Sequence, residues 1–351
     1  MQNSMSYHGP GGVKDPVSGV REKTVSSSLE LEKQTQNYIQ QLLDIETRLS
    51  EPGVNQEKIQ AEVNAVTDRM LEACAQFEQK VNDPFKIKAA QVIFRERTNA
   101  ILGKSYFIHR TRNWPQGHQG DYSTLEMAYK NTPMSAGLGH YLDRYMLLTT
   151  LTKGVQGRII KLRDLLKAEL SIRRNPSVLD VACGSCREVF ELAPDIKASN
   201  ARFICVDLDE DALDYALDRL SLAGLSDDNV ELRKYNALRI FDFETAQLEF
   251  GRQDLIYSVG YFDYLPDDFL VKLMNSLYKL LSPGGKLIAS FKDANRYNFH
   301  VFHWLVNWDG FLQRTEADFE RIFNSTEIPS KALLVERVES GSILFYTATK
   351  E

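Results

Sequence analysis

The sequence has little cysteine and no long apolar run. Its four cysteines are too few and too irregularly spaced for the disulfide framework of a small secreted domain. No stretch approaches the roughly 18 consecutive apolar residues that mark a membrane-spanning helix. The polar segment from Met1 to Lys23 also lacks the apolar core of a signal peptide. These absences lead us to expect a cytoplasmic protein without a membrane span.

The sequence also has fewer positively than negatively charged residues. Lys and Arg total 42 against 48 Asp and Glu, which gives a formal net charge of −6. Proteins that bind a phosphate backbone are usually basic, so this balance argues against a nucleic-acid partner. The remaining composition is that of an ordinary globular protein, with 43% apolar and 26% charged residues. A length of 351 residues predicts two domains.

The chain divides into three parts. We expect residues 1–27, which are polar, to form a disordered tail. Residues 28–175 have apolar residues at helical spacing, which predicts an all-helical N-terminal domain that acts as a lid. Residues 176–351 alternate strand and helix patterns. The expected strands are 177–182, 202–207, 229–234, 254–259, 286–291, 332–338 and 342–348, and the expected helices are 186–195, 210–223, 238–247 and 266–281.

This alternation predicts an α/β fold with a Rossmann-like, seven-stranded sheet covered by helices on both faces. The turn Glu339-Ser340-Gly341 is short enough for a hairpin, so the end of the chain adds an antiparallel strand. In open sheets of this kind, ligands bind outside the carboxyl ends of the strands. The residues at those strand ends should therefore surround one pocket.

The stretch Val178–Glu188 carries the strongest functional signal. An apolar strand ends in Asp180, a turn of small residues follows, and helical character begins after Arg187. About twenty residues later, a second apolar strand ends in Asp207. This unit is typical of sites for nucleoside-bearing cofactors, since the turn brings backbone N–H groups to the ligand and the second acid can accept hydrogen bonds from both ribose hydroxyls.

From Ser177 to Phe291 the sequence resembles the class I S-adenosylmethionine-dependent methyltransferases. Its first loop, Asp180–Cys186, keeps only the middle glycine, Gly184, of the family pattern acid-x-Gly-x-Gly-x-Gly. Asn236 stands where the family commonly has an acid near the adenine, and its side-chain carbonyl can bond the exocyclic amine. The strand Gln253–Ser258 and the turn Leu281–Leu287 also resemble family segments, in the family's order and spacing.

A narrower resemblance covers roughly residues 130–325. The segments Gly137–Tyr145, Ala182–Glu188 and Gly260–Asp267 are similar to a bacterial subfamily that includes proteins for biosynthesis of the methyl ester of 3-hydroxypalmitic acid. The implied acceptor is a small molecule of secondary metabolism, such as a hydroxy-fatty acid carboxylate. Azetidine-2-carboxylate synthases share the same ancestry, and they cyclise S-adenosylmethionine and release methylthioadenosine.

The resemblance implies S-adenosyl-L-methionine as the cofactor and a small-molecule acceptor as the partner. An acceptor hydroxyl or amine would require a general base, and aromatic faces after the fourth strand can stabilise a sulfonium. The expected site has three sets of residues. They are the cofactor-binding residues Asp180, Ala182, Cys183, Gly184, Asp207, Leu208, Asn236, Ala237, Ser258 and Val259, the catalytic residues Tyr261, Asp263 and Tyr264, and the substrate-pocket residues Tyr141, Tyr145, His300 and His303.

Several alternatives remain open at this level. Cys183 and Cys186 have the spacing of a zinc or redox pair, but structural thiols are the simpler interpretation, and we expect no metal. His300 and His303 would instead pack within an amphipathic helix. A non-catalytic module that binds the cofactor competes with the two enzyme hypotheses. Dinucleotide binding is disfavoured because no second mononucleotide-binding half follows, and the chain's oligomeric state, including a homodimer, stays undetermined.

Overall fold

The structure is a computed structural model that describes the chain from residue 16 and its side chains from residue 26. It separates into two compact units that meet between Ile101 and Leu102. The sequence placed the domain boundary between residues 175 and 176 instead. The difference arises because helix α7 (Thr150–Ile172) packs against helices and a strand of the C-terminal α/β region. Among the described residues, no helix has the length and apolar character needed to cross a membrane.

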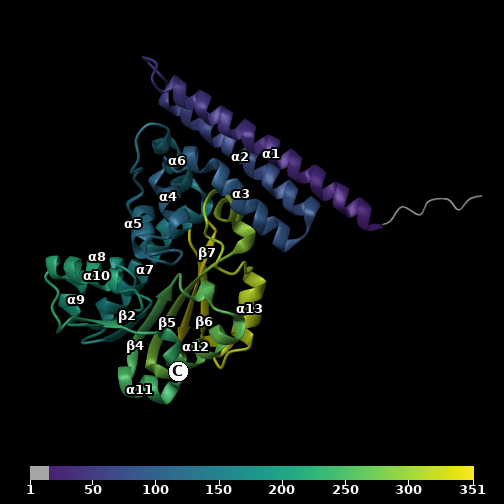
Figure 1. Ribbon diagram of the computed structural model, residues 1–351. Coiled ribbons are helices and arrows are strands. Elements are labelled where there is room, and N and C mark those ends of the chain that lie inside the picture. Colours follow the sequence, from purple (N-terminus) through teal and green to yellow (C-terminus); the bar gives the residue numbers. More distant parts are fainter. Residues whose placement is uncertain (1–15) are drawn as a thin grey trace, which may run out of the picture. The chain divides into compact units, whose positions relative to one another are not determined.

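The first unit consists of helices α1 (Pro16–Arg48), α2 (Gln56–Val81) and most of α3 (Pro84–Leu102), with α1 and α2 packed along each other (Figure 1). The tail expected over residues 1–27 is wrong from residue 16 onward, where α1 begins, and residues 1–15 lie outside the described part. Pro16 suits the first turn of a helix, and no second proline occurs before residue 28 to interrupt it.

Four helices open the second unit: α4 (Tyr106–Asn113), α5 (Tyr122–Lys130), α6 (Leu138–Leu148) and α7. Side chains that accept backbone N–H groups determine where three of them begin. Ser105 caps α4, Asp121 caps α5 and Thr149 caps α7. Thr149 is also the last residue of the turn that ends α6, so α6 and α7 are separated by a single residue.

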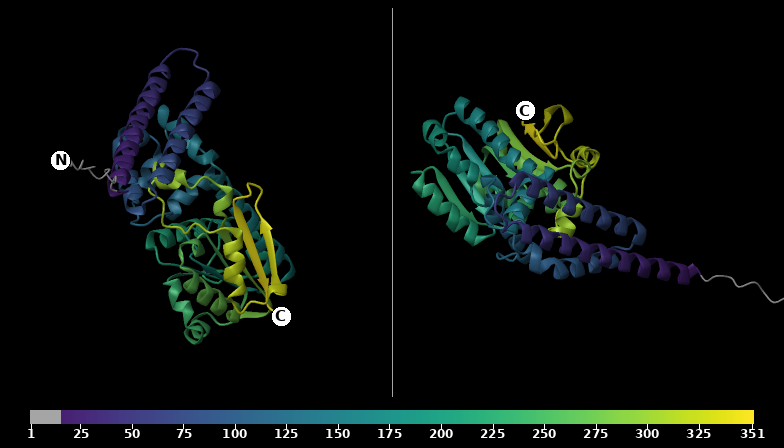
Figure 2. Two further views of the ribbon diagram at one scale, coloured as in Figure 1. Left: turned by 90° about the vertical axis from the view of Figure 1, so that its right-hand side faces the viewer. Right: turned by 90° about the horizontal axis from the view of Figure 1, so that it is seen from above.

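The sheet has seven strands in the order β3-β2-β1-β4-β5-β7-β6. Strands β1 to β5 are parallel, and β7 is antiparallel to both of its neighbours. Figures 1 and 2 show the yellow C-terminal hairpin at one edge of this sheet. The bounds, each within a few residues of the expected ones, are β1 (Ser177–Val181), β2 (Arg202–Asp207), β3 (Val230–Lys234), β4 (Gln253–Val259), β5 (Leu281–Lys292), β6 (Leu333–Arg337) and β7 (Ile343–Thr349).

The helices of the sheet region are α8 (Arg187–Glu191), α9 (Ala193–Ser199), α10 (Glu210–Leu222), α11 (Phe243–Phe250), α12 (Asp267–Leu280) and α13 (Glu316–Asn324). Two expected helices are split. The helix expected at 186–195 breaks at Leu192, because Pro194 lies in the first turn of a new helix, α9. The helix expected at 238–247 begins as a 3₁₀ turn, and α11 starts only after Asp242, whose side chain caps it.

Strand β1 lies between β2 and β4 and forms the apolar centre of the sheet. Val178, Leu179 and Val181 are completely buried, as expected for parallel strands that are covered on both faces. The register pairs Asp180 with Cys205 on β2 and with Tyr257 on β4. The carboxyl end of β1 therefore lies between the ends of β2 and β4. The candidate functional site lies at these strand ends.

Candidate functional site

The carboxyl ends of the parallel strands open into a cavity of about 810 Å³. This volume is within the usual range for ligand pockets. Helices α4, α5 and α7 and the segment 302–311 supply its other walls. Nine residues expected from the sequence line it: Ala182, Gly184, Asp207, Leu208, Asn236, Ala237, Val259, Tyr261 and Tyr264.

The loop after β1 has the backbone conformation of a glycine-rich turn, although it contains one glycine. Ala182, Gly184 and Cys186 have φ values of 61°, 54° and 47°, in the left-handed region that favours glycine. A Cβ at Gly184 would meet only the Cβ of Tyr122, at 3.9 Å. The space beside Gly184 is therefore open to a ligand.

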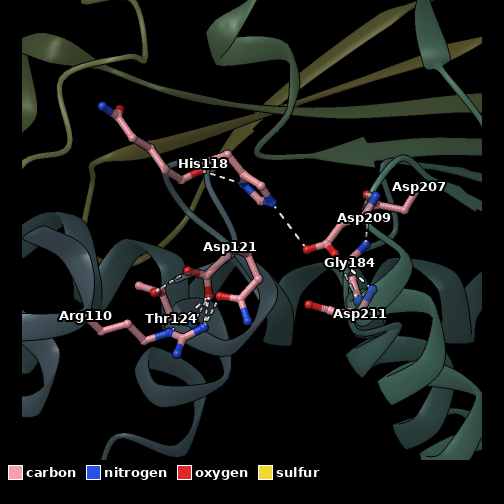
Figure 3. Close-up of polar contacts among 11 residues, drawn as sticks. Arg110, His118, Asp121, Thr124, Gly184, Asp207, Asp209 and Asp211 are labelled. Atoms are coloured by element: carbon pink, nitrogen blue, oxygen red, sulfur yellow. Dashed lines mark hydrogen bonds and ion pairs between the residues drawn. The ribbon is translucent and has the colours of Figure 1, made fainter. Parts of the chain in front are cut away.

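Asp207, at the end of β2, is already held in position by the backbone. Its Oδ2 accepts the N–H of Gly184 at 2.7 Å, and its Oδ1 accepts the N–H of Asp209 at 3.0 Å. A carboxylate has about four acceptor positions, so each oxygen keeps one for a ligand hydroxyl. Figure 3 shows Asp207 beside Gly184. This geometry suits recognition of the two hydroxyls of a ribose.

Asn236 lines the cavity but differs in detail from the expectation. Its Oδ1, which was expected to bond an adenine amine, accepts the N–H of Leu238 at 3.0 Å and caps the 3₁₀ turn that begins at Ala237. The second lone pair of this oxygen and the amide group remain to contact a base. Asn236 therefore holds the rim of the cavity in shape as well as facing it.

Three of the expected cofactor residues do not line the cavity. Ser258 is buried, and its hydroxyl donates to the carbonyl of Val181 at 2.7 Å, which ties β4 to β1. Asp180 is only 2% exposed and lies below the loop. Cys183 also lies in the loop outside the lining. The expected cofactor residues therefore divide into residues that line the cavity and residues that support the loop beneath it.

A short loop, residues 114–121, covers the cavity. His118 reaches Asp209 on the cofactor side, with its Nε2 3.3 Å from Oδ2 (Figure 3). On the other side, the Oε1 of Gln119 accepts the N–H of Gly310 at 2.6 Å. Arg110 contacts Asp121 at 2.9 Å and fixes the point where the loop ends. We call residues 114–121 the lid loop, since polar contacts connect it to both sides of the opening.

A buried ion pair closes the far end of the cavity. The Nζ of Lys292, at the end of β5, is 2.6 Å from the Oδ2 of Asp263. Lys292 lines the cavity, whereas Asp263 lies behind it and is 1% exposed. Asp263 is therefore misplaced as a catalytic base, and the structure makes it the positioning partner of Lys292. Burial lowers the pKa of Lys292, and the charge of Asp263 acts against that shift.

Aromatic side chains surround Lys292. Its Nζ is 4.7 Å from the ring centroid of Phe311 and 5.6 Å from that of Tyr264, distances suited to cation–π contacts. The Nε1 of Trp308 donates to the Tyr264 hydroxyl at 2.6 Å. Burial raises the pKa of Tyr264, and burial likewise raises that of Tyr261. Both phenols thus stay protonated at neutral pH.

Arg158 on α7 adds a second cation to this wall. It is 2% exposed, its Nη2 donates to the Tyr129 hydroxyl at 3.1 Å, and its Nε has no hydrogen-bond partner. Gly260 makes room for it, because a Cβ there would be 2.7 Å from the Arg158 Nη1. Within the described part of the chain, Arg158 forms no ion pair. Arg158 thus lines the cavity as a buried cation without a carboxylate partner among the described residues.

The expected substrate-pocket residues are not part of the lining. Tyr141 and Tyr145 are buried on α6, which packs against α4 and α7. His300 contacts Asn298 and stacks on Phe299, and His303 lies in the short helical segment Val301–Leu305, which begins directly after His300. The alternative that these histidines pack among neighbouring residues fits the structure better.

Sequence reasoning missed the lid loop, Arg158 and Lys292. No local pattern marks Arg158, which follows the ordinary helical period of α7. Sequence reasoning also missed Glu126 on α5, which anchors the loop after β1, residues 182–186. We call this loop the cofactor loop. The Glu126 carboxylate accepts the Ser185 hydroxyl at 2.7 Å and pairs with Arg219 at 2.6 Å. These contacts join residues far apart in sequence, so only the fold brings them together.

Comparisons with known proteins give a family match and similar folds. Residues 178–285 match a family model described as a methyltransferase domain, and a search of curated proteins finds no match. A possible exported protein from Bordetella parapertussis shares the fold, at 18% identity and a TM-score of 0.55, over 96% of this chain and 99% of its own.

Two methyltransferase structures show weaker similarity. Magnesium protoporphyrin IX methyltransferase from Synechocystis PCC 6803, with bound SAH, has 15% identity over 57% of this chain and 86% of its own, with a TM-score of 0.43. N-methyltransferase NodS from Bradyrhizobium japonicum WM9 has 17% identity over 55% and 97%, with a TM-score of 0.37. The strand order and the cavity at the strand ends are those of a Rossmann-like class I methyltransferase sheet, and residues 178–285 within it match the methyltransferase-domain family.

Proposed function

We propose that this chain transfers the methyl group of S-adenosylmethionine to a carboxylate on a small apolar molecule, forming a methyl ester. The observation that carries this proposal is Arg158, a buried guanidinium that lines the cavity and forms no ion pair within the described residues. A carboxylate fits a guanidinium with two parallel hydrogen bonds. An uncharged acceptor would leave that buried positive charge without a counter-ion, which is costly in a site closed to water.

The residues at the strand ends fit the cofactor. When bound, S-adenosylmethionine supplies a methyl group on a sulfonium, which is already an activated electrophile. Asp207 has acceptor positions for the ribose hydroxyls, and the open space at Gly184 allows the cofactor close to the backbone. We call the opposite side of the cavity, formed by α4, α5, α7, Lys292 and the segment 302–311, the acceptor wall. Tyr261 lines the cavity between the strand ends and this acceptor wall. These residues bind and orient the cofactor.

The charge of the acceptor wall favours an anion. Arg158 and Lys292 each carry a positive charge, and Asp263 supplies one negative charge. The wall therefore keeps one unbalanced positive charge, which an acceptor carboxylate would neutralise. The rest of this wall is apolar, so it suits the hydrocarbon part of an acid. Its apolar members are Phe107, Leu125, Ala128, Leu151, Val155, Phe302, Trp308 and Phe311.

A carboxylate acceptor also fits this wall because its attack needs no general base. Among the described lining residues of α4, α5 and α7 and of the segment 302–311, none has a carboxylate or an imidazole. Burial keeps Tyr261 and Tyr264 protonated by raising their pKa values. A carboxylate attacks without losing a proton, so the protein needs only to align it with the methyl group. The lid loop excludes water from the reacting groups.

3-Hydroxypalmitate, the acid whose methyl ester the resembling subfamily is associated with, is one member of this substrate class, and we retain it as a candidate acceptor. A hydroxy acid would use the cationic wall for its carboxylate and the apolar wall for its chain. The cytoplasmic location and the homodimer considered from the sequence stay predictions.

The test incubates the purified chain with S-adenosylmethionine and acids, alcohols or amines that share one apolar tail. Mass spectrometry should find methyl esters and S-adenosylhomocysteine, and no methyl ethers. Arg158→Met should lower ester formation at least tenfold with the affinity for S-adenosylhomocysteine unchanged. Arg163→Met, on the same helix but outside the cavity lining, should behave like the wild type.

Three outcomes would contradict the proposal. Enzyme-dependent methylthioadenosine without an acceptor would indicate the cyclase reaction. Cofactor binding without any methylated product across the acid panel would indicate a non-catalytic module. A loss of S-adenosylhomocysteine affinity in Arg158→Met would show that the arginine holds the cofactor's own carboxylate instead.

A further inference from the structure

Three thiols and two carboxylates gather beneath the cofactor loop. Asp180 ends β1, Cys205 is its register partner on β2, Cys183 and Cys186 lie in the loop, and Glu188 is on α8. The ligand atoms of Asp180, Cys183 and Cys186 all lie within 4.8 Å of one another. Cys205 lies next to Asp180 across the sheet, as its register partner on the neighbouring parallel strand. None of these five residues lines the cofactor cavity.

This cluster has acidic groups but no basic partner. The Oδ2 of Asp180 is buried and has no hydrogen-bond partner. Glu188 accepts the Tyr257 hydroxyl at 2.8 Å. In the region from residue 26 onward, neither carboxylate forms an ion pair with Lys, Arg or His. Buried carboxylates are normally paired with a cation or bound to a metal, so this arrangement requires either added protons or a cation.

The donor set suits a soft divalent metal. Cys183 and Cys186 have the two-residue spacing common in structural zinc sites. The N–H of Cys186 donates to the carbonyl of Cys183 at 3.1 Å, so both cysteines lie on one turn. Two thiolates and one carboxylate are ligands that Zn²⁺ accepts, and a third thiolate completes a tetrahedron. Cys183 is only half-buried, which gives an ion a route of entry.

We propose that Asp180, Cys183 and Cys186, with Cys205 as the fourth ligand, bind one zinc-like divalent cation as a structural site. Binding would release the proton of each thiol and form a metal–sulfur bond in its place. The ion would join β1, β2 and the loop that presents Gly184. The site is separate from the acceptor wall, so it does not depend on the methyl-transfer proposal.

The test uses the full chain, purified under reducing conditions and stripped of metal with a chelator. Cobalt serves as the spectroscopic probe. We expect one Co²⁺ per chain with a thiolate-to-cobalt charge-transfer band, displacement of that band by Zn²⁺, and a rise in Tm with either metal. Cys183→Ser and Cys186→Ala should lose the band. Cys74→Ala, which removes the buried thiol of α2, should keep it.

The wild-type titration is decisive even if a variant fails to fold. A reduced wild-type chain that shows no charge-transfer band and no metal-dependent rise in Tm would overturn the proposal, since the cluster would then be neutral through protonation. A Cys183–Cys186 disulfide in the chain as purified without reductant, found by peptide mass spectrometry, would also overturn it. S-adenosylhomocysteine affinity, measured in parallel on the metal-free wild-type chain, tests the methyltransferase assignment separately from the metal site.

Discussion

Asp207→Ala is the most direct test of the cofactor site. The substitution removes the carboxylate that would accept two ribose hydroxyls, and it also frees the N–H groups of Gly184 and Asp209. Both N–H groups lie at the edge of the cavity, where water can reach them. The fold should therefore survive, while the loop loses an anchor.

The expected magnitude follows from these hydrogen bonds. A hydrogen bond to a charged group contributes about 1.5–3 kcal/mol, and water in the empty site offsets part of the two that are lost. We therefore expect a loss of about 2–4 kcal/mol in cofactor binding, which is roughly a 30- to 700-fold rise in Kd. Asp207→Asn keeps the shape and one acceptor oxygen, so it should lose about 1–2 kcal/mol.

Isothermal calorimetry with S-adenosylhomocysteine measures these effects, and circular dichroism checks the fold. Asp214→Ala is the matched control, because it removes the same charge from an exposed position on α10. It should bind like the wild type. Wild-type affinity in a folded Asp207→Ala variant would refute the assignment of Asp207 to the ribose, and with it our description of the cofactor half of the cavity.

Three further predictions concern stability. Lys292→Met should destabilise the fold by about 3–5 kcal/mol, because it leaves Asp263 buried and unpaired, and adding Asp263→Leu should recover most of the lost Tm. Burial alone would raise the pKa of Glu126, but hydrogen bonds, with Arg219 the strongest donor, outweigh it and lower the pKa below the ordinary 4.5. The ionised Glu126 thus stabilises the folded state above pH 4.5, and this stabilisation is lost as the pH falls through the lower pKa that Glu126 has in the folded state. The free energy of unfolding of Glu126→Gln, measured in urea, should therefore depend less on pH in that acidic range than the free energy of unfolding of the wild type. A chain reduced to Leu102–Glu351, the second compact unit, should fold and bind S-adenosylhomocysteine in calorimetry, and failure of that chain to fold would contradict the division.

The sheet was predictable because buried parallel strands leave a strong trace in the sequence. Val178–Val181 and Phe203–Val206 are short apolar runs that each lead into an acid or a turn, and the structure places both as adjacent strands. The alternation of such runs with helical patterns determines the strand order to a large extent. The cofactor half of the cavity follows, because its residues stand at the strand ends.

The acceptor half could not be predicted in the same way. Lys292 and Asp263 are 29 residues apart, and their ion pair exists only because β5 ends beside the turn after β4. Arg158 occupies a helix that a sequence pattern assigns to a separate domain. His300 and His303 carried a stronger chemical signal than either cation, yet the fold directs them elsewhere. Residue type indicated candidate chemistry, but long-range packing determined which side chains face the cavity.

The unusual composition of the cofactor loop is explained by the direction of its side chains. In the sequence, Ala182 and Cys186 stand where the family pattern has glycines, so the loop departs from that pattern. Both residues nevertheless keep the left-handed backbone, at a cost of about 1–2 kcal/mol each. Ala182 presents only a methyl group to the cavity, and Cys186 is fully buried outside it. Gly184 is the one position where a longer side chain would fill the ligand's space, and it is the one that remains glycine. The loop has therefore kept the backbone conformation and the open space that cofactor binding requires.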